Sequence, residues 1–241
     1  MFSDEFLNNL AYRFSGGRQR YFQPYIDHLI PTLRQGTIDT LYMVFWSSLF
    51  AILIGICIGL IMYLTKPGGI HPMPFLNRFI GVLVNIGRSI PFVVLIILVF
   101  PFSVHIVGTS IGRTAAIVPL TIAAIPFMSR VIESALNELG HGIIEAAVAA
   151  GANTRQIIFR VILPESAPSL VAGFTLLIIN LITFSAMAGI VGGGGLGHLA
   201  NSYGLQRHRR DILVGVVIIL VVLVQIIQIV GQIIAKKLDK R

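Results

Sequence analysis

Charged side chains are scarce in this sequence. Asp, Glu, Lys and Arg together make up 12% of the 241 residues, whereas a soluble domain typically carries about 25%. Hydrophobic residues make up 55%, and five stretches are apolar for long enough to cross a hydrocarbon core, which takes about 20 residues of helix. The composition therefore excludes a soluble enzyme and a nucleic-acid binder. It indicates an all-α integral membrane protein in contact with lipid.

Cysteine and metal-ligand patterns are also missing. The single cysteine, Cys57, lies within an apolar run and can form no disulfide within the chain. The six histidines are scattered, without the paired spacing that is typical of a metal site. We therefore expect this chain to bind no metal and no cofactor.

The sequence contains no G-x-x-x-x-G-K-[ST] motif, so ATP is not expected to bind this chain. The segment Gly192 to Gly197 formally matches G-x-G-x-x-G. It follows an apolar helix rather than a strand, however, so dinucleotide binding is not expected. We interpret this glycine run as a hinge or a re-entrant bend.

Acidic residues are absent from the middle of the apolar stretches, since Asp39, Glu133 and Glu138 all lie near the ends. An ion-coupled secondary transporter would use such intramembrane carboxylates or broken helices. A membrane-embedded enzyme would need a nucleophile, a base or a metal cluster that converge, and the sequence shows no such cluster. These two classes are the alternatives to a transport path that another protein drives.

The spans are predicted from apolar runs bounded by charge, proline or glycine. They cover about residues 38–65, 79–102, 113–139, 167–190 and 212–235. The third span contains Pro119 and Pro126, which a membrane helix tolerates where neighbouring groups satisfy the freed backbone. We therefore expect this span to pack inside a bundle. In the first span, Gly55 and Gly59 have the spacing that lets a second helix approach closely, although ordinary packing explains them equally well.

Residues 1–30 form a separate N-terminal extension before a membrane domain of residues 31–241. Phe2, Phe6, Leu10 and Phe14 are spaced by four and would line one face of an amphipathic helix. This helix would lie on the membrane interface or pack on the outside of the bundle. Five spans place the two termini on opposite sides of the membrane, but basic residues are divided almost evenly, so the positive-inside rule leaves the orientation open.

The segment 140–164 is too polar for the bilayer core and too apolar for a free linker. It predicts two short helices joined by a turn at Gly151. Asn153 or Thr154 would cap the second helix, and Pro164 would end it. We interpret the segment as a rigid elbow that docks into another protein, with an ordinary amphipathic connector as the alternative.

The spacing within this segment resembles the EAA loop of ABC importer permeases. The matching residues are Glu145, Ala146, Ala147, Gly151, Leu163 and Pro164, with Val161 standing where the family usually has isoleucine. Other segments are similar to the methionine-type subfamily in particular. They are Asn85–Phe92, Val107–Gly112, Ala116–Thr121 and Ser185–Met187, and the resemblance extends over about residues 32–241.

The resemblance implies the type I ABC importer permease fold, with five transmembrane helices and a cytoplasmic coupling loop at 140–164. It implies a homodimer, two cytoplasmic subunits that bind ATP with Mg²⁺ and hydrolyse it, and an extracytoplasmic substrate-binding lipoprotein. This chain would then be a transport subunit and not an enzyme, and its solute would be D- or L-methionine or a related amino acid, with another small solute as the alternative. It would lie in a bacterial inner membrane with its N-terminus outside and its C-terminus in the cytoplasm.

Three residues are candidates for the translocation path. Met187 and Ser185 directly precede the glycine run, and Met187 would either close the path or fill space between helices. Arg88 is a charge within the second span, which would line the path, contact a substrate carboxylate or snorkel to the cytoplasmic interface. Arg130 and Glu133 lie three residues apart on one helix face and predict a structural ion pair.

Overall fold

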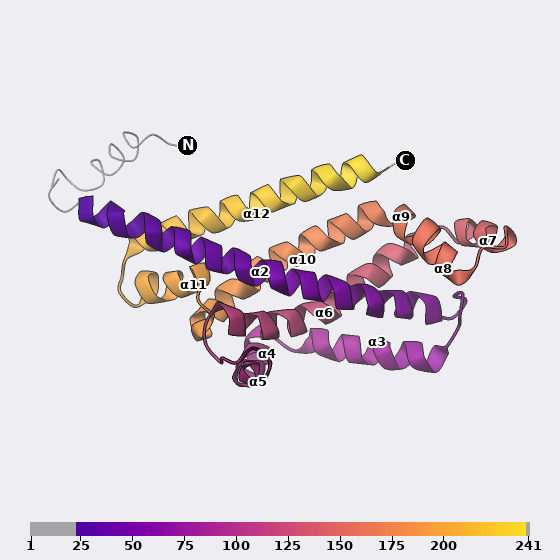
Figure 1. Ribbon diagram of the computed structural model, residues 1–241, viewed down its shortest axis with the longest axis horizontal. Helices are drawn as coiled ribbons and strands as arrows, with labels where there is room; N and C mark the ends of the chain where they lie inside the picture. The colour runs from indigo at the N-terminus through magenta and orange to yellow at the C-terminus, as the bar shows by residue number, and fades with distance from the viewer. Residues whose placement is uncertain (1–22, 240–241) are drawn as a thin grey trace.

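The computed structural model describes residues 23–239, and every regular element in that range is a helix (Figure 1). The amphipathic helix predicted near Phe2 to Phe14 lies outside the described residues. The first described helix, α2 (Gln23–Thr65), has 43 residues and is about 64 Å long. Pro31 lies inside it, and Leu29 and Leu33 on either side of this proline pack against the same apolar cluster. The fold therefore shows no helix boundary at residue 30.

The long helices run through the molecule in alternating directions (Figure 1). They are α2, α3 (Pro74–Ser89), α6 (Arg113–Asn137), α10 (Ala167–Ala188) and α12 (Arg210–Leu238). We call one extremity of the molecule the α7 end, where the turn 66–73, the loop 138–166 and the end of α12 lie together (Figure 1). The opposite extremity, with the segments 90–112 and 189–209, is the α11 end.

Helix α6 lies at the centre of the bundle. In its most apolar 18-residue window 61% of the residues are buried, whereas the corresponding value for α12 is 11%. The two glycines of α2 allow α6 to approach, since a Cβ at Gly55 would lie 2.8 Å from Met128 Cγ and one at Gly59 would lie 2.8 Å from Ile132 Cβ. Close packing at this glycine pair is thus confirmed, and the exposed apolar surface of α12 is suited to lipid.

Four of the described helices are long and apolar enough to cross a membrane, and the number is five if a bent pair of helices counts as one span. The second span was predicted over about residues 79–102, with interruptions at Arg88 and Pro91. The structure has instead α3 followed by α4 (Phe92–Val99), a helical turn at Phe100–Phe102 and α5 (Ser103–Val107), with a bend of 96° between α3 and the rest. Pro91 causes the break, because it donates no backbone hydrogen bond and keeps Ile90 extended (φ −80°, ψ 121°).

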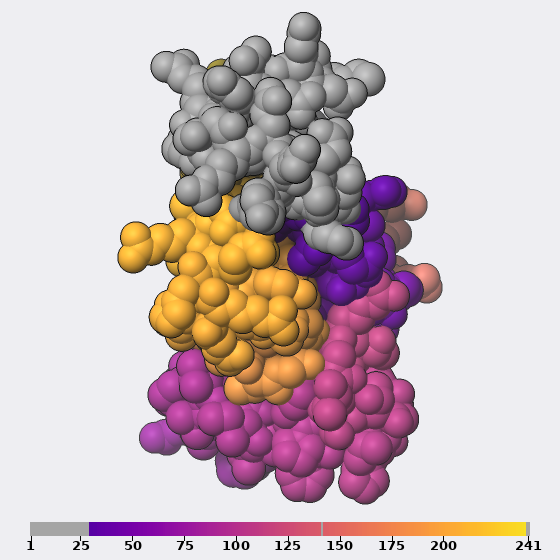
Figure 2. Space-filling model, turned by 90° about the vertical axis from the view of Figure 1, so that its left-hand side faces the viewer, coloured from indigo at the N-terminus to yellow at the C-terminus, as the bar shows by residue number. Residues whose placement is uncertain are grey.

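The glycine run ends α10 and begins a short re-entrant segment. A kinked turn at Gly189–Gly193 leads into α11 (Gly195–Leu199) and a further turn at Ala200–Leu205, after which α12 starts. Figure 2 shows this segment, in orange, packed between the indigo start of α2 and the magenta connection from α3 to α6. The prediction of a single span followed by a re-entrant bend matches this arrangement, although α11 itself was not foreseen.

Candidate functional site

The loop between α6 and α10 folds into a projection at the α7 end (Figure 1). Helix α7 (His141–Ala149) starts after Gly140, which is extended at φ −61° and ψ 134°. Leu139, one residue earlier, is 7% exposed and belongs to the main core. The base of the projection is therefore anchored in the bundle, while α7 itself extends outward.

Gly151 makes the turn that the sequence predicted. Its φ is +76°, a value that favours glycine because a Cβ would clash with the backbone. The Gly151 N–H donates to the Val148 carbonyl at 2.9 Å, and the Ala152 N–H donates to the Ala147 carbonyl at 3.1 Å. This pair of bonds is a Schellman motif, which satisfies carbonyls at the end of α7 and fixes the direction of the chain that follows.

The second piece begins with a capping box at Asn153. The Gln156 N–H donates to Asn153 Oδ1 and the Asn153 N–H donates to Gln156 Oε1, both at 2.9 Å. Of the two predicted caps, Asn153 is therefore the one used. Thr154 has another partner, since its Oγ1 lies 2.9 Å from His71 Nε2 in the turn after α2. The projection is thus tied to a second part of the bundle.

The two faces of the projection differ in burial. The inward face packs on the main core through Ile144, Ala147, Ile157, Ile162 and Leu163. The outward face, which we call the α7 knob, consists of Gly142, Ile143, Glu145, Ala146, Val148 and Ala149, all of them exposed. Among the described side chains, none forms a hydrogen bond or an ion pair with Glu145. An exposed and mostly apolar knob with one carboxylate has the composition of a protein-docking surface.

Pro164 does not end the second piece, contrary to the prediction. The chain passes from α8 (Thr154–Gln156) through a π-helical turn at Ile157–Ile162 into α9 (Leu163–Glu165). Pro164 falls in the first turn of α9, where its missing N–H is not needed. One further turn at Ser166, whose hydroxyl donates to the Ile162 carbonyl at 2.7 Å, leads into α10. The projection therefore continues into a transmembrane helix through an almost unbroken helical path.

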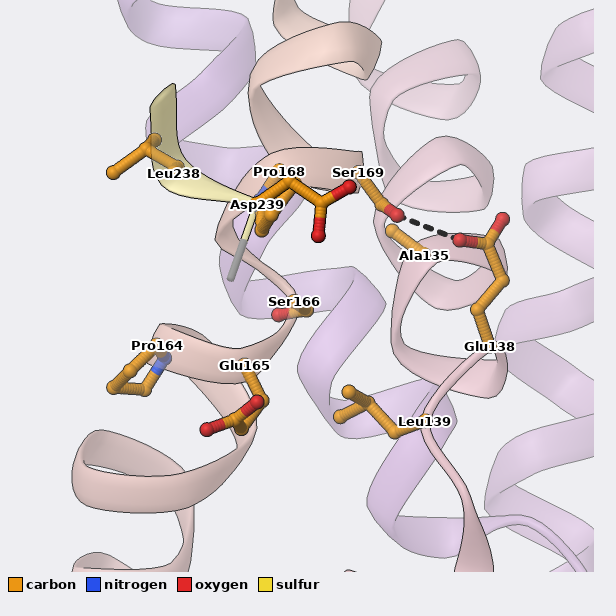
Figure 3. Close-up of a pocket in the computed structure, with 10 residues that line it drawn as sticks. All are labelled: Ala135, Glu138, Leu139, Pro164, Glu165, Ser166, Pro168, Ser169, Leu238 and Asp239. Carbon is orange, nitrogen blue, oxygen red and sulfur yellow. Dashed lines mark hydrogen bonds between the residues drawn. The ribbon is translucent and has the colours of Figure 1, made fainter. Parts of the chain in front are cut away.

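A groove between α6, α9, α10 and the end of α12 lies beside this path (Figure 3). The Ser169 hydroxyl donates to Glu138 Oε2 at 2.6 Å across the groove, from the start of α10 to the end of α6. Leu238 and Asp239, the last described residues, line the same groove. The end of α12 and the loop 138–166 are thus on the same side of the bundle.

The ion pair predicted between Arg130 and Glu133 is confirmed, with Arg130 Nη1 at 2.6 Å from Glu133 Oε2. Arg130 also donates to Asn85 Oδ1 at 2.8 Å and so joins α6 to α3. In the turn after α2, Lys66 donates to Asn137 Oδ1 at the end of α6. Burial lowers the pKa of the Lys66 ammonium, and the Glu133 carboxylate acts in the opposite direction. These bonds fasten α2 and α3 to the end of α6 from which the projection arises.

The glycine run contacts other parts of this chain rather than forming a phosphate cradle on a strand. The Leu196 N–H donates to Thr40 Oγ1 of α2 at 2.9 Å, and the Gly112 N–H donates to the Gly192 carbonyl at 2.9 Å. The φ values of Gly192 and Gly194 are +102° and +80°. Positive φ at these positions lets the chain reverse direction and return toward α2 and α6.

The two path candidates before the glycine run lie in different environments. Ser185 is 1% exposed, and its hydroxyl donates to the Ile182 carbonyl at 2.7 Å. In this conformation Ser185 is therefore part of the packed interior and faces no open path. Met187 is 38% exposed in the last turn of α10, near the α11 end. A gate role for Met187 stays a prediction.

Arg88 lies in the last turn of α3, about 21 Å along the helix from Pro74. This distance is too great for its side chain to snorkel to the interface at the α7 end. Arg88 instead lines a cavity beside the bend between α3 and α4. Sequence reasoning missed this cavity, although Pro91 was the signal for the bend that forms it.

The comparisons with known proteins agree with this geometry. The family described as "Binding-protein-dependent transport system inner membrane component" matches residues 55–241. A probable D-methionine transport system permease protein of Vibrio cholerae is 48% identical over 87% of this chain and 93% of its own length. The methionine import system permease protein of Bacillus subtilis is 43% identical over 92% of this chain and 99% of its own length.

Solved structures resemble the whole bundle. An inward-facing structure of the MetNI methionine ABC transporter matches with a TM-score of 0.85 and 44% identity, over 87% of this chain and 97% of that chain. An amino acid ABC transporter solved with histidines has a TM-score of 0.73 at 17% identity and shares the fold. The family model matches residues 55–241, and the two relatives are 43–48% identical over most of this chain. This protein therefore belongs to the family of binding-protein-dependent transport system inner membrane components.

Proposed function

We propose that this chain is the transmembrane subunit of an ATP-driven methionine importer, and that its α7 knob receives the motion of a partner ATPase. The supporting observation is the knob itself, which is exposed and largely apolar, and which the Gly151 turn joins to a nearly continuous helical path into α10. Coupling between two proteins requires an element that both can bias. A stiff projection anchored to α2, α6 and α10 meets this requirement.

Methionine is proposed as the solute because the similar permeases carry that name. Both relatives described above, and the matched transporter structure, are named for methionine at 43–48% identity. The complex would contain two copies of this chain and two ATPase subunits. A substrate-binding lipoprotein would deliver methionine at the α11 end, where Met187 would act as the gate beside the re-entrant segment.

Uptake into vesicles tests this function. Proteoliposomes that hold this chain and its ATPase, with the binding protein outside and ATP inside, should accumulate radiolabelled methionine. Vesicles without the ATPase, or with a non-hydrolysable nucleotide, should accumulate none. Uptake that needs no ATPase and is abolished by a proton or sodium ionophore would instead support an ion-coupled transporter.

The proposed orientation places the α7 end in the cytoplasm. We expect a cysteine at Gln206, at the α11 end, to react with a membrane-impermeant maleimide in intact spheroplasts. A cysteine at Val148 should react only after permeabilisation. Both variants would be made after replacing Cys57 by serine, and the reverse labelling pattern would show that the α7 end faces outward.

A further inference from the structure

The cavity beside the bend between α3 and α4 lies at mid-depth in the bundle. It has a volume of about 350 Å³, within the range of roughly 300–1,000 Å³ that is usual for small-molecule sites. Ala123 and Phe127 reach it from near the middle of α6, and Asn180 reaches it from the middle of α10. The cavity is therefore far from the α7 knob, and Ile90, Pro91 and Phe92 line it where the chain turns toward the α11 end.

Two polar side chains line this cavity, and the structure gives neither of them a partner. Neither Arg88 nor Asn180 forms a hydrogen bond or an ion pair with any described residue. A charge within a membrane-spanning region is costly unless it faces a partner, a water-filled path or a ligand. Arg88 is exposed in the single chain, so this face of α3 is unsuited to lipid.

The remaining walls of the cavity are apolar and aromatic. Phe92 and Phe184 stack with their ring centroids 4.4 Å apart and an interplanar angle of 10°, and Phe127 lines the same space. Aromatic rings make favourable contacts with aliphatic groups and with thioether sulfur. The cavity thus combines one cation and one amide with an aromatic wall.

The broken helix adds a third polar feature. Pro91 precedes the first residue of α4, so the helix starts at the cavity, with Phe92 among the lining residues. The start of a helix carries partial positive charge from its free N–H groups. Half-helices that start at mid-membrane are used in transporters to hold the anionic group of a solute.

We propose that this cavity is a transmembrane binding site for the amino acid in transit. Arg88 would pair with the α-carboxylate, Asn180 would accept a hydrogen bond from the ammonium group, and the aromatic wall would contact the apolar side chain. The chemical class is therefore a zwitterionic α-amino acid with an apolar side chain. This inference rests on the proposed function, because it assigns a site to the solute of that function.

Direct binding to the permease–ATPase complex, without the binding protein, tests the site. The complex in lipid nanodiscs should bind radiolabelled L-methionine, and Arg88→Gln should weaken this binding by at least about tenfold, as expected for loss of a charge-assisted hydrogen bond. L-Methioninol, which lacks the carboxylate, should compete poorly in the wild-type complex. In Arg88→Gln the preference for methionine over methioninol should disappear.

Arg78→Gln is the matched control. Arg78 is an exposed arginine near the start of the same helix and does not line the cavity, so its replacement should leave methionine binding unchanged. Methionine bound to the ATPase would be insensitive to both substitutions. The site is refuted if the wild-type complex binds no methionine or if Arg88→Gln binds it as tightly as wild type does.

The two proposals fail separately. If wild-type vesicles import methionine but Arg88→Gln binds methionine as tightly as wild type does, the cavity site is refuted and the proposed function stands. Wild-type vesicles that import no methionine would refute the proposed function itself. Methioninol competition in the wild-type complex keeps the test informative even if Arg88→Gln does not assemble.

Discussion

Replacing Gly151 by tryptophan should abolish ATP-driven uptake while the chain still folds into the membrane. A Cβ at this position would meet no atom within 4 Å, and Gly151 is exposed, so the new side chain starts in open space. Two effects remain. The left-handed φ of +76° would cost roughly 1–2 kcal/mol with any ordinary side chain, and the indole would stand on the outward side of the loop, where the ATPase is proposed to dock. Uptake, ATPase activity and co-purification of the ATPase would be measured together.

Gly151→Asn separates the two effects. Asparagine tolerates a left-handed backbone better than most residues and adds little bulk in the open space beside the turn. We expect this variant to keep the turn and most of the uptake, at least several-fold above the tryptophan variant. Normal uptake by Gly151→Trp would mean that the loop does not dock, and the connector interpretation of residues 140–164 would then replace the coupling one.

The sequence predicts the features that depend on neighbouring residues. Apolar runs locate the long helices, and the Asn153 cap and the Gly151 turn follow from local backbone chemistry. The Arg130–Glu133 pair follows from helical spacing. Each of these structures involves residues within a few positions of one another, so no knowledge of the tertiary fold is needed to predict it.

Features that depend on distant contacts were not predicted. Thr154 could be read as a cap, but its observed partner is His71, 83 residues earlier. Ser185 was a path candidate because of its place before the glycine run, yet the packing of α10 buries it. Arg88 could be identified as an unusual charge, whereas its cavity exists only because α3 bends at Pro91 and meets α6 and α10. Sequence spacing alone cannot supply such contacts.

The bonds at the α7 end suggest how motion of the knob would reach the other end of the bundle. The His71–Thr154 contact joins the projection to the turn between α2 and α3, and Arg130 joins α6 to Asn85 on α3. The re-entrant segment contacts α2 through Thr40 and the start of α6 through Gly112. Helices α2 and α6 therefore connect the α7 knob with the re-entrant segment at the α11 end. Motion of the knob can move this segment only if the segment is tightly packed against the helices.

Replacing Gly197 by alanine should strongly destabilise the protein. A Cβ at Gly197 would overlap the backbone carbonyl and Cα of Ala186, and backbone atoms cannot move aside as the end of a flexible side chain can. Overpacking usually costs about 1–3 kcal/mol, and contact with fixed backbone places this substitution at the upper end or beyond. We expect a lower melting temperature in detergent and loss of transport, measured by thermal-shift size-exclusion chromatography and by uptake.

Gly81→Ala is the matched control, since it adds the same methyl group to a glycine of α3 whose nearest neighbour would be Met62 Cε at 3.9 Å. With ordinary contact distances and a helical backbone, this substitution should be neutral or should stabilise the protein by up to about 1 kcal/mol, because alanine favours helix over glycine. The opposite signs of the two changes would show that the re-entrant segment is held by backbone-to-backbone packing against α10. If Gly197→Ala melted at the wild-type temperature, α11 would have to be loosely packed, and no rigid connection could run from the α7 knob to the re-entrant segment.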